Sequence, residues 1–261
     1  MILPTTMLSA HYRDLILYKT QADLRAEAAK TYIGFLWWVL DPLMFMMIFY
    51  VVFGLLLKRA TPDFVPFLLI GLVSWRWFQN TISHGATAIL GGRSLMQQVY
   101  LPKVILPLVV ILTDLVKFGV VLGLMLIYLW SAGFGVGWSY LALPALLLSH
   151  FLLILGLTLL VAAIVPFVPD LRFLVEHLLQ IAFYMSGIFF SGATIPERYQ
   201  PYFYLNPMAN IIEAYRDILL HRTWPNWSAL AIVAVLGFGI SLLAYEFLTR
   251  NDHLYPKLVQ R

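Results

Sequence analysis

Residues 141–165 read LALPALLLSHFLLILGLTLLVAAIV, an apolar run that contains no Asp, Glu, Lys or Arg. A bilayer core about 30 Å thick takes ~20 helical residues per crossing, so the run is long enough to span a membrane. It stops at Pro166 and Pro169, and proline cannot continue a helix. The sequence therefore predicts a transmembrane helix over 141–165.

The rest of the chain has the same apolar character. Of its 261 residues, 61% are apolar and only 11% are charged, and the mean hydropathy is +0.84. Soluble domains are about 45–50% apolar and about 25% charged, so the composition excludes a soluble domain, a disordered chain, a collagen-like repeat and a disulfide scaffold. There is no cysteine, which excludes thiol chemistry and zinc–thiolate sites. The composition predicts a polytopic membrane protein.

Five further apolar runs have lengths suited to a membrane crossing. They cover about 35–57, 64–90, 105–130, 174–190 and 230–248. With 141–165 they predict an all-α integral membrane protein with six transmembrane helices. We expect a cytoplasmic interface segment at 1–34, a six-helix transmembrane domain at 35–250 and a cytoplasmic tail at 251–261.

The distribution of basic residues predicts the orientation in the membrane. With the N-terminus in the cytoplasm, the inner segments hold ten Lys and Arg residues and the outer segments hold five. Cytoplasmic loops of membrane proteins carry the excess of Lys and Arg, so both termini are expected in the cytoplasm. The formal net charge of +4 is not clustered along the chain, and nucleic acid is not an expected partner.

The first 34 residues are charged and do not resemble a signal peptide, which needs a basic start, an apolar run and a small-residue cleavage site. Leu8, Tyr12, Leu15 and Tyr18 recur at spacings of three and four, as on one face of a helix. This pattern predicts an amphipathic helix lying at the membrane surface. A solvated lead-in helix is the alternative.

The segment 191–227 differs from a plain loop because it combines four prolines with several aromatic residues. Asn206-Pro207 is a good helix start, since Asn caps a helix and Pro is tolerated at its first position. We expect the following helix to lie at the outer surface or to re-enter the membrane against the other helices. Its apolar face would hold Ile211, Ile212, Tyr215, Ile218 and Leu219, and its polar face Asn210, Glu213, Arg216 and Asp217.

Two ionisable residues of opposite sign, Asp114 and Lys117, fall inside the run 105–130. At 1.5 Å per residue they lie roughly 14–18 Å from the start of that run, near the middle of a bilayer. Charged groups at this depth are costly and are functional candidates. They either neutralise each other against another helix or belong to a polar stripe along a translocation path.

The aromatic residues of the apolar runs admit two interpretations. Trp and Tyr gather at membrane interfaces, and an aromatic ring can also pack against the apolar face of a sugar in a transport path. The sequence contains no G-x-x-x-x-G-K-[ST] phosphate loop, no H-E-x-x-H metal motif and no G-x-S-x-G elbow. Catalysis is therefore not expected of this chain, nor is a metal or cofactor in it. If ATP drives the protein, a separate subunit hydrolyses it.

Several short stretches, in order along the chain, resemble one family. They are GFLWW at 34–38, DPL at 41–43, VFG at 52–54, VYLPK at 99–103, LPL at 106–108 and NPM at 206–208. Together they resemble the ABC-2 type permeases of polysaccharide exporters, a family that includes O-antigen, capsule and teichoic acid export. Gln98 stands where many of these permeases have a basic residue.

The resemblance implies a homodimer of six-helix subunits in the bacterial inner membrane, each bound to a cytoplasmic ATPase subunit that holds ATP and Mg²⁺. The substrate would be a polysaccharide on an undecaprenyl-diphosphate carrier, with O-antigen preferred. A permease for a smaller lipid or a drug is an alternative with the same fold. An ion-driven carrier or a non-transporting membrane scaffold is an alternative of another class.

Four sets of residues are candidates for these roles. Because guanidinium groups pair bidentately with phosphate, the candidates for the carrier diphosphate are Arg13, Arg25 and Arg93. The candidates for docking the ATPase are Arg93, Gln97, Gln98 and Lys103. The candidates for the translocation path are Trp38, Tyr50, Trp75, Arg76, Phe78, Asp114, Lys117, Phe183 and Tyr184. The motif residues of the outer segment are Asn206, Pro207 and Arg216.

Overall fold

The computed structural model describes residues 10–29, 34–49, 51–52, 63–98 and 101–258, and all regular structure within these ranges is helical. The longer helices are α1 (Ala10–Ala29), α2 (Trp37–Phe49), α3 (Phe64–Gly91), α5 (Ile105–Ser131), α6 (Leu143–Ile164), α7 (Leu171–Met185) and α10 (Trp227–Arg250). The shorter ones are η1 (Gly34–Leu36), α4 (Arg93–Gln98), η3 (Trp138–Ala142), η4 (Gly192–Thr194), η5 (Glu197–Tyr199), α8 (Gln200–Phe203), α9 (Pro207–Arg216), the π-helix η6 (Asp217–His221) and α11 (Tyr255–Leu258).

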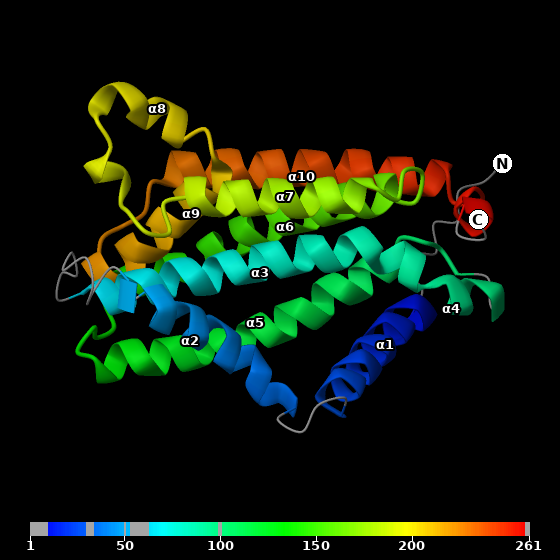
Figure 1. The fold of residues 1–261 in the computed structure, drawn as a ribbon, viewed down its shortest axis with the longest axis horizontal. Coiled ribbons are helices and arrows are strands. Elements are labelled where there is room, and N and C mark those ends of the chain that lie inside the picture. Colours follow the sequence, from blue (N-terminus) through cyan, green and yellow to red (C-terminus); the bar gives the residue numbers. More distant parts are fainter. Residues whose placement is uncertain (1–9, 30–33, 50, 53–62, 99–100, 259–261) are drawn as a thin grey trace.

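The helices α3, α5, α6, α7 and α10 run along the long axis of the molecule and form a bundle (Figure 1). The helix α2 crosses beside α3 and α5, and α1 lies at a slant next to α5. The short helices α4 and α11 lie at one end of the bundle, whereas α8 and α9 lie at the other (Figure 1). The helices α4 and α11 therefore lie at the same end of the bundle, and the orientation of that end in a membrane stays a prediction.

Three of the described helical segments are long and apolar enough to cross a membrane, namely Ile105–Ser131, Trp138–Ile164 and Trp227–Arg250. Each begins or ends within a few residues of the predicted run. The count of six crossings stays a prediction. Of the predicted run 35–57, α2 takes 13 residues, and positions 50 and 53–57 lie outside the described residues.

Two other predicted runs, 64–90 and 174–190, correspond to α3 and α7. The run 64–90 matches α3 in its bounds, but α3 is the most enclosed helix of the bundle, with Leu68, Leu72 and Trp75 all 0% exposed. The predicted run 174–190 is displaced toward the C-terminus, since α7 begins at Leu171 and ends at Met185. The chain turns there through Gly187, whose φ of +70° favours glycine.

The helices α6 and α10 approach each other closely through two glycines. A Cβ atom on Gly156 would lie 2.4 Å from the carbonyl oxygen of Gly237, and one on Gly237 would lie 2.5 Å from the backbone of Leu152 and Leu153. Small residues let membrane helices pack backbone to backbone. The opposite face of α10 is apolar and exposed, with Val235 at 72%, as a surface covered by lipid would be.

The predicted N-terminal helix is present as α1, but its predicted apolar face is wrong in part. Tyr12 and Leu15 pack against an apolar cluster at this end of the bundle, whereas Tyr18 is 73% exposed. The covered side continues instead to Thr20, which is 6% exposed. The reason is that α1 packs on α5 along one side, and Tyr18 points away from that contact. Leu8 lies outside the described residues.

Candidate functional site

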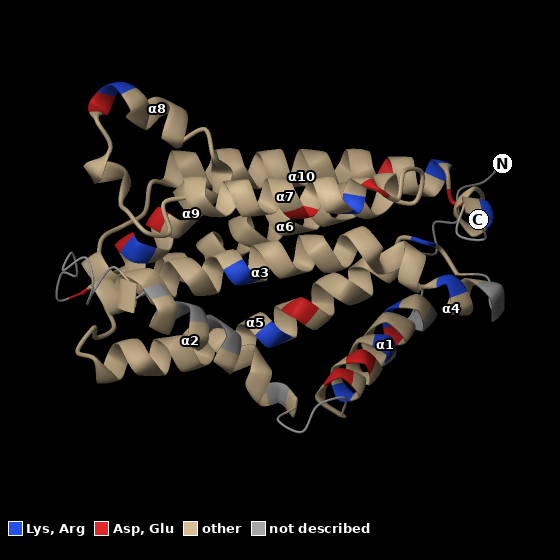
Figure 2. Ribbon diagram, viewed as in Figure 1, with Lys and Arg blue, Asp and Glu red and all other residues tan. Residues whose placement is uncertain are grey.

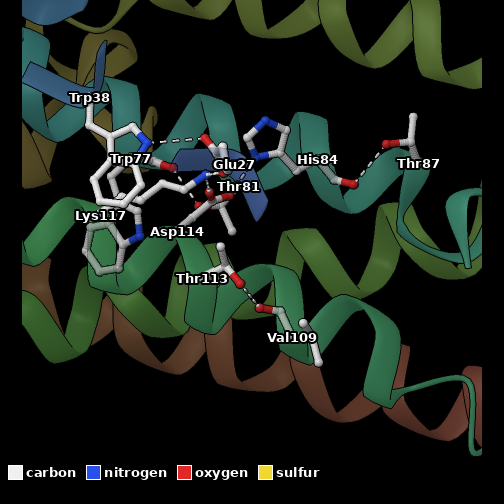
Figure 3. A network of polar contacts seen from close by, with 10 residues as sticks. All are labelled: Glu27, Trp38, Trp77, Thr81, His84, Thr87, Val109, Thr113, Asp114 and Lys117. Carbon is white, nitrogen blue, oxygen red and sulfur yellow. Dashed lines mark hydrogen bonds and ion pairs between the residues drawn. The ribbon is translucent and has the colours of Figure 1, made fainter. Parts of the chain in front are cut away.

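A cluster of ionisable side chains joins α1, α3 and α5. Many charged residues lie on α1 or toward the ends of the bundle, but α3 and α5 carry some at mid-length (Figure 2). On α5, Lys117 Nζ lies 3.3 Å from Asp114 Oδ1. Lys117 Nζ also lies 2.5 Å from Glu27 Oε2 of α1, and His84 Nδ1 of α3 lies 2.8 Å from Asp114 Oδ2 (Figure 3). The expected ion pair between Asp114 and Lys117 is present, and it faces two other helices.

Burial makes Asp114 the central member of this cluster. Its side chain is 5% exposed, against 14% for Lys117 and 45% for Glu27. A buried carboxylate without partners is costly, and Lys117 and His84 supply the partners. The indole Nε1 of Trp38 donates to Glu27 Oε1 at 3.2 Å, which adds α2 to the connected helices. The cluster therefore holds four helices together through polar contacts.

Glu27 and His84 were missed among the candidate residues. Each lies far from Asp114 in sequence, and spacing along one helix says nothing about which residues face it from another. The polar positions of α3 are the signal that could have found His84, because Arg76, Asn80 and His84 recur every four residues. Charged or polar residues at one helical spacing mark one face.

A cavity of about 190 Å³ opens beside the cluster, between α1, α2, α3 and α5. Besides the cluster itself, Trp38, Arg76 and Asn80 line it. Trp77 lines it too, and the indole N–H of Trp77 is buried without a hydrogen-bond partner in the described part of the chain. Four of the predicted path residues, Trp38, Arg76, Asp114 and Lys117, thus border a single cavity.

A second cavity, of about 400 Å³, lies between α3 and α7. Its wall is polar and aromatic, and it is formed by Arg76, Gln79, Ser83, Glu176, Gln180, Phe183 and Tyr184. Arg76 of α3 borders both cavities, so this part of α3 lies between them. The predicted path residues Phe183 and Tyr184 therefore meet Arg76 across this second cavity.

The predicted path residues Trp75 and Phe78 have a different environment. They are 0% and 5% exposed, and neither lines the two cavities. The Trp75 ring packs on Phe78 and Phe183 with centroids 5.2 and 5.8 Å away, and its Nε1 donates to Gln79 Oε1 at 3.0 Å. The structure places both in the core of the bundle. Tyr50 lies outside the described residues.

The predicted diphosphate-binding residues are at the surface. Arg13 is exposed on α1 and pairs with Asp14 at 3.4 Å. Arg25 is exposed about three turns further along α1. Arg93 is exposed at the start of α4. Gln97 and Gln98 belong to the same short helix. Arg93 and the two glutamines therefore lie at the end of the bundle where docking was predicted.

Lys103 departs from its predicted position on an exposed docking surface. The residue is 3% exposed. Its Nζ lies 3.3 Å from Asp252 Oδ2, and its backbone N–H donates to Asp252 Oδ1 at 2.8 Å. The C-terminal segment covers Lys103 and supplies a carboxylate, an arrangement that local spacing in the sequence could not reveal.

The outer helix begins as predicted. The Asn206 side chain accepts a hydrogen bond from the Met208 N–H at 3.0 Å, and Pro207 is the first helical residue. The five residues of the predicted apolar face are all 0% exposed. They pack α9 and η6 into the same core as α3 and α6, so the helix is an integral part of the bundle.

Arg216 was predicted on the polar face of this helix and is instead buried, with 2% exposed. Its guanidinium donates to the carbonyl oxygens of Gly187 at 2.8 Å and Ile188 at 2.9 Å. It also lies 3.4 Å over the Phe67 ring. The guanidinium has five N–H donors in a fixed fork, so it can satisfy the carbonyls of a tight turn. A charged residue can therefore be buried here, although its type predicted a polar face. Gly71 leaves room for it, since a Cβ there would lie 2.9 Å from Arg216 Nη2.

Comparison with protein families accounts for most of this chain. A family model described as "ABC-2 type transporter" matches residues 18–220. The chain belongs to the ABC-2 type transporter family. The matched region includes the ionisable cluster, both cavities and Arg216.

Three curated relatives are similar to this ABC-2 protein over nearly their whole length. The O-antigen export system permease protein RfbA of Myxococcus xanthus is 30% identical over 87% of this chain and 88% of the relative. The protein of the same name from Klebsiella pneumoniae is 22% identical over 94% of this chain and 95% of the relative. The polysialic acid transport protein KpsM of Escherichia coli is 27% identical over 84% of this chain and 88% of the relative.

Proposed function

We propose that the chain is the permease subunit of an ATP-driven polysaccharide exporter, with O-antigen as its substrate. In this proposal two copies form the membrane domain, with six crossings each and both termini in the cytoplasm. A separate ATPase subunit binds ATP and Mg²⁺ and docks at the end of the bundle that bears α4. The polysaccharide crosses the bacterial inner membrane on an undecaprenyl-diphosphate carrier.

The observation that carries the proposal is the near full-length similarity to proteins named as O-antigen export permeases. The similarity covers both ends of the bundle, and the relatives are themselves about the length of this chain. A similarity limited to the apolar helices would support only a membrane protein. The further relative named for polysialic acid transport supports a polysaccharide as the class of substrate.

The polar strip of α3 supports a transport path on the side of the bundle that faces α2 and α7. Arg76, Asn80 and Ser83 lie along it, and a cavity opens on each side. Polar side chains on a membrane helix face protein or a water-filled cavity because lipid does not solvate them. Sugar hydroxyls need hydrogen-bonding groups, and Trp38 and Tyr184 add aromatic surfaces. Polar side chains together with aromatic surfaces are what a path for hydrated sugars requires.

The inner end of the bundle supports the arrangement of partners. Arg93, Gln97 and Gln98 belong to the six-residue helix α4, and Arg93 at its start is exposed, where in this proposal the ATPase reaches it. Arg13 and Arg25 are exposed on α1. In this proposal they bind the diphosphate of a lipid carrier, for which guanidinium is a suitable partner. The exposed apolar face of α10 suits contact with lipid.

The proposal is tested by purifying the chain from its own membranes in mild detergent and identifying what purifies with it. We expect a stoichiometric ATPase subunit, and we expect depletion of the chain to leave lipid-linked polysaccharide inside the cell. Arg93→Glu should reduce ATPase recovery, whereas Arg172→Glu, an exposed arginine on α7, should not. Reproducible absence of an ATPase from intact protein would contradict the proposal. Normal surface polysaccharide after depletion, with the ATPase present, would favour a smaller lipid substrate.

A further inference from the structure

The C-terminal segment 251–258 folds back onto the end of the bundle that bears α4. After α10 ends, Asp252 reaches the start of α5 and accepts hydrogen bonds from the backbone N–H of Lys103 at 2.8 Å and from its ammonium at 3.3 Å. Lys103 is 3% exposed. A buried ammonium needs partners, and Asp252 is one that holds Lys103 in place.

A second anchor lies three residues further along. Tyr255 is 0% exposed, and its hydroxyl donates to the carbonyl oxygen of Ala163 near the end of α6 at 3.1 Å. Its ring packs edge-on against Phe167, with centroids 5.5 Å apart, and Phe167 packs in turn against Phe247 of α10. The segment is thereby fixed to α6, α10 and the turn between α6 and α7.

The short helix α4 depends on these neighbours for its position. A helix of six residues is not stable by its own hydrogen bonds. Its apolar side chains Leu95 and Met96 pack into the cluster that contains Tyr255, Ile105 and Leu106, and α11 contacts α4 directly. What covers this cluster therefore determines where the exposed face of α4 points.

We propose that segment 251–258 is a strut that positions α4 for the ATPase subunit, with Asp252 and Tyr255 as its positioning residues. This inference rests on the proposed function, since it assigns α4 to ATPase docking. In this proposal α4 rests on α11 and on the cluster around Tyr255. Tyr255 ties the segment to α6, and Asp252 ties it to Lys103 at the start of α5. The segment itself continues from α10. The strut thus joins the docking helix to three long helices at once.

The experiment compares purified full-length variants for their affinity toward the ATPase subunit, per folded molecule after size-exclusion chromatography. Asp252→Ala should weaken the affinity about tenfold, within the range common for coupling between two sites. Asp252→Asn should weaken it less, because the amide oxygen still accepts from the Lys103 N–H. Glu246→Ala is the control, since Glu246 pairs with Arg250 in an exposed site on the last turns of α10, and it should leave the affinity unchanged.

Tyr255→Phe keeps the inference testable where Asp252→Ala does not fold, because it removes one hydroxyl and leaves the ring packing. It should weaken the affinity severalfold with little change in the yield of folded protein. A role in stability alone would lower the yield and leave the affinity per folded molecule at the wild-type value, and that result overturns the strut. Failure of the unaltered chain to bind an ATPase overturns the proposed function itself and the strut with it.

Discussion

The two sides of α3 are held together in different ways. On one side, which we call the closed side, α6, α9 and α10 pack through apolar side chains, glycine contacts and one buried arginine that bonds to backbone carbonyls. On the other, the open side, α2 and α5 contact α3 and α1 contacts α5, around charged groups and a cavity of about 190 Å³. Close packing resists displacement, whereas the contact between Lys117 and Glu27, whose side chain is 45% exposed, competes with water. The open side is therefore where movement during transport is expected.

The largest expected effect belongs to the closed side. Arg216→Ala removes the donors that satisfy the Gly187 and Ile188 carbonyls. It should lower the free energy of unfolding by about 3–5 kcal/mol, because two hydrogen bonds to a charged group are lost and their buried acceptors are left unsatisfied. An unfolding titration with SDS in mixed micelles measures this. Arg222→Ala is the control, because Arg222 is exposed and donates to the Gly133 carbonyl at the rim of the bundle. Equal, small losses in both variants would mean that the closed side does not depend on Arg216.

The next effect tests the backbone contact between α6 and α10. Gly237→Ala places a methyl group 2.5 Å from the α6 backbone, which forces the helices apart and should cost about 1–3 kcal/mol, as for other overpacked sites. Gly239→Ala, two residues along the same helix, meets nothing within 4 Å and should be neutral or slightly stabilising, since alanine favours a helix over glycine. The same SDS titration compares the two. An unchanged free energy of unfolding in Gly237→Ala would show that α6 and α10 are not in close backbone contact at this position.

The contrast between the two sides also explains what the sequence could predict. The closed side is formed by features with local signatures: the uncharged run 141–165, the apolar face of the outer helix and the Asn206-Pro207 start. The structure has α6 and α9 close to the positions that these patterns predict. The sequence also indicated the Asp114–Lys117 pair, because the two residues lie three apart on one helix.

What the sequence could not predict are contacts between residues distant along the chain. Arg216 was assigned to a polar face by residue type, and Lys103 to a docking surface by its place in a cytoplasmic loop. Both are buried against partners from other segments. Glu27 and His84 reach Asp114 and Lys117 only because α1 and α3 pack on α5 in one register. Such contacts depend on the relative rotation of helices, which hydrophobic periodicity does not determine.

On the open side we expect a small effect on stability and a larger one on export. Glu27→Gln weakens a half-exposed contact among α1, α2 and α5, so the free energy of unfolding should change by less than about 1 kcal/mol. The rate of polysaccharide export should change severalfold, because the same contact sets the shape of the cavity. Lys19→Gln is the control, since Lys19 pairs with Asp23 within α1 alone. If Glu27→Gln exports polysaccharide at the unaltered rate, the contact between Glu27 and Lys117 does not limit movement during transport.

The smallest expected effect concerns the attachment of the outer segment to the closed side. Glu213 of α9 accepts from the Gly192 N–H at 2.6 Å and from the Tyr204 hydroxyl at 3.2 Å. Tyr204→Phe removes only the second bond, at a half-exposed site, and should cost about 0.5 kcal/mol, the low end for a hydrogen bond.

Burial, and then the Glu213 carboxylate, raise the pKa of Tyr204 from its ordinary value of 10.0 to about 12. A raised pKa means that the neutral phenol is the form favoured by folding, so its contribution is complete below pH 10 and is lost as the pH rises toward 12. The stability difference between Tyr204→Phe and the unaltered chain should therefore stay constant from pH 7 to 10 and shrink above it. A difference that already shrinks below pH 10 would show that the phenol is not held by Glu213, and that the outer segment is attached to α9 through Gly192 alone.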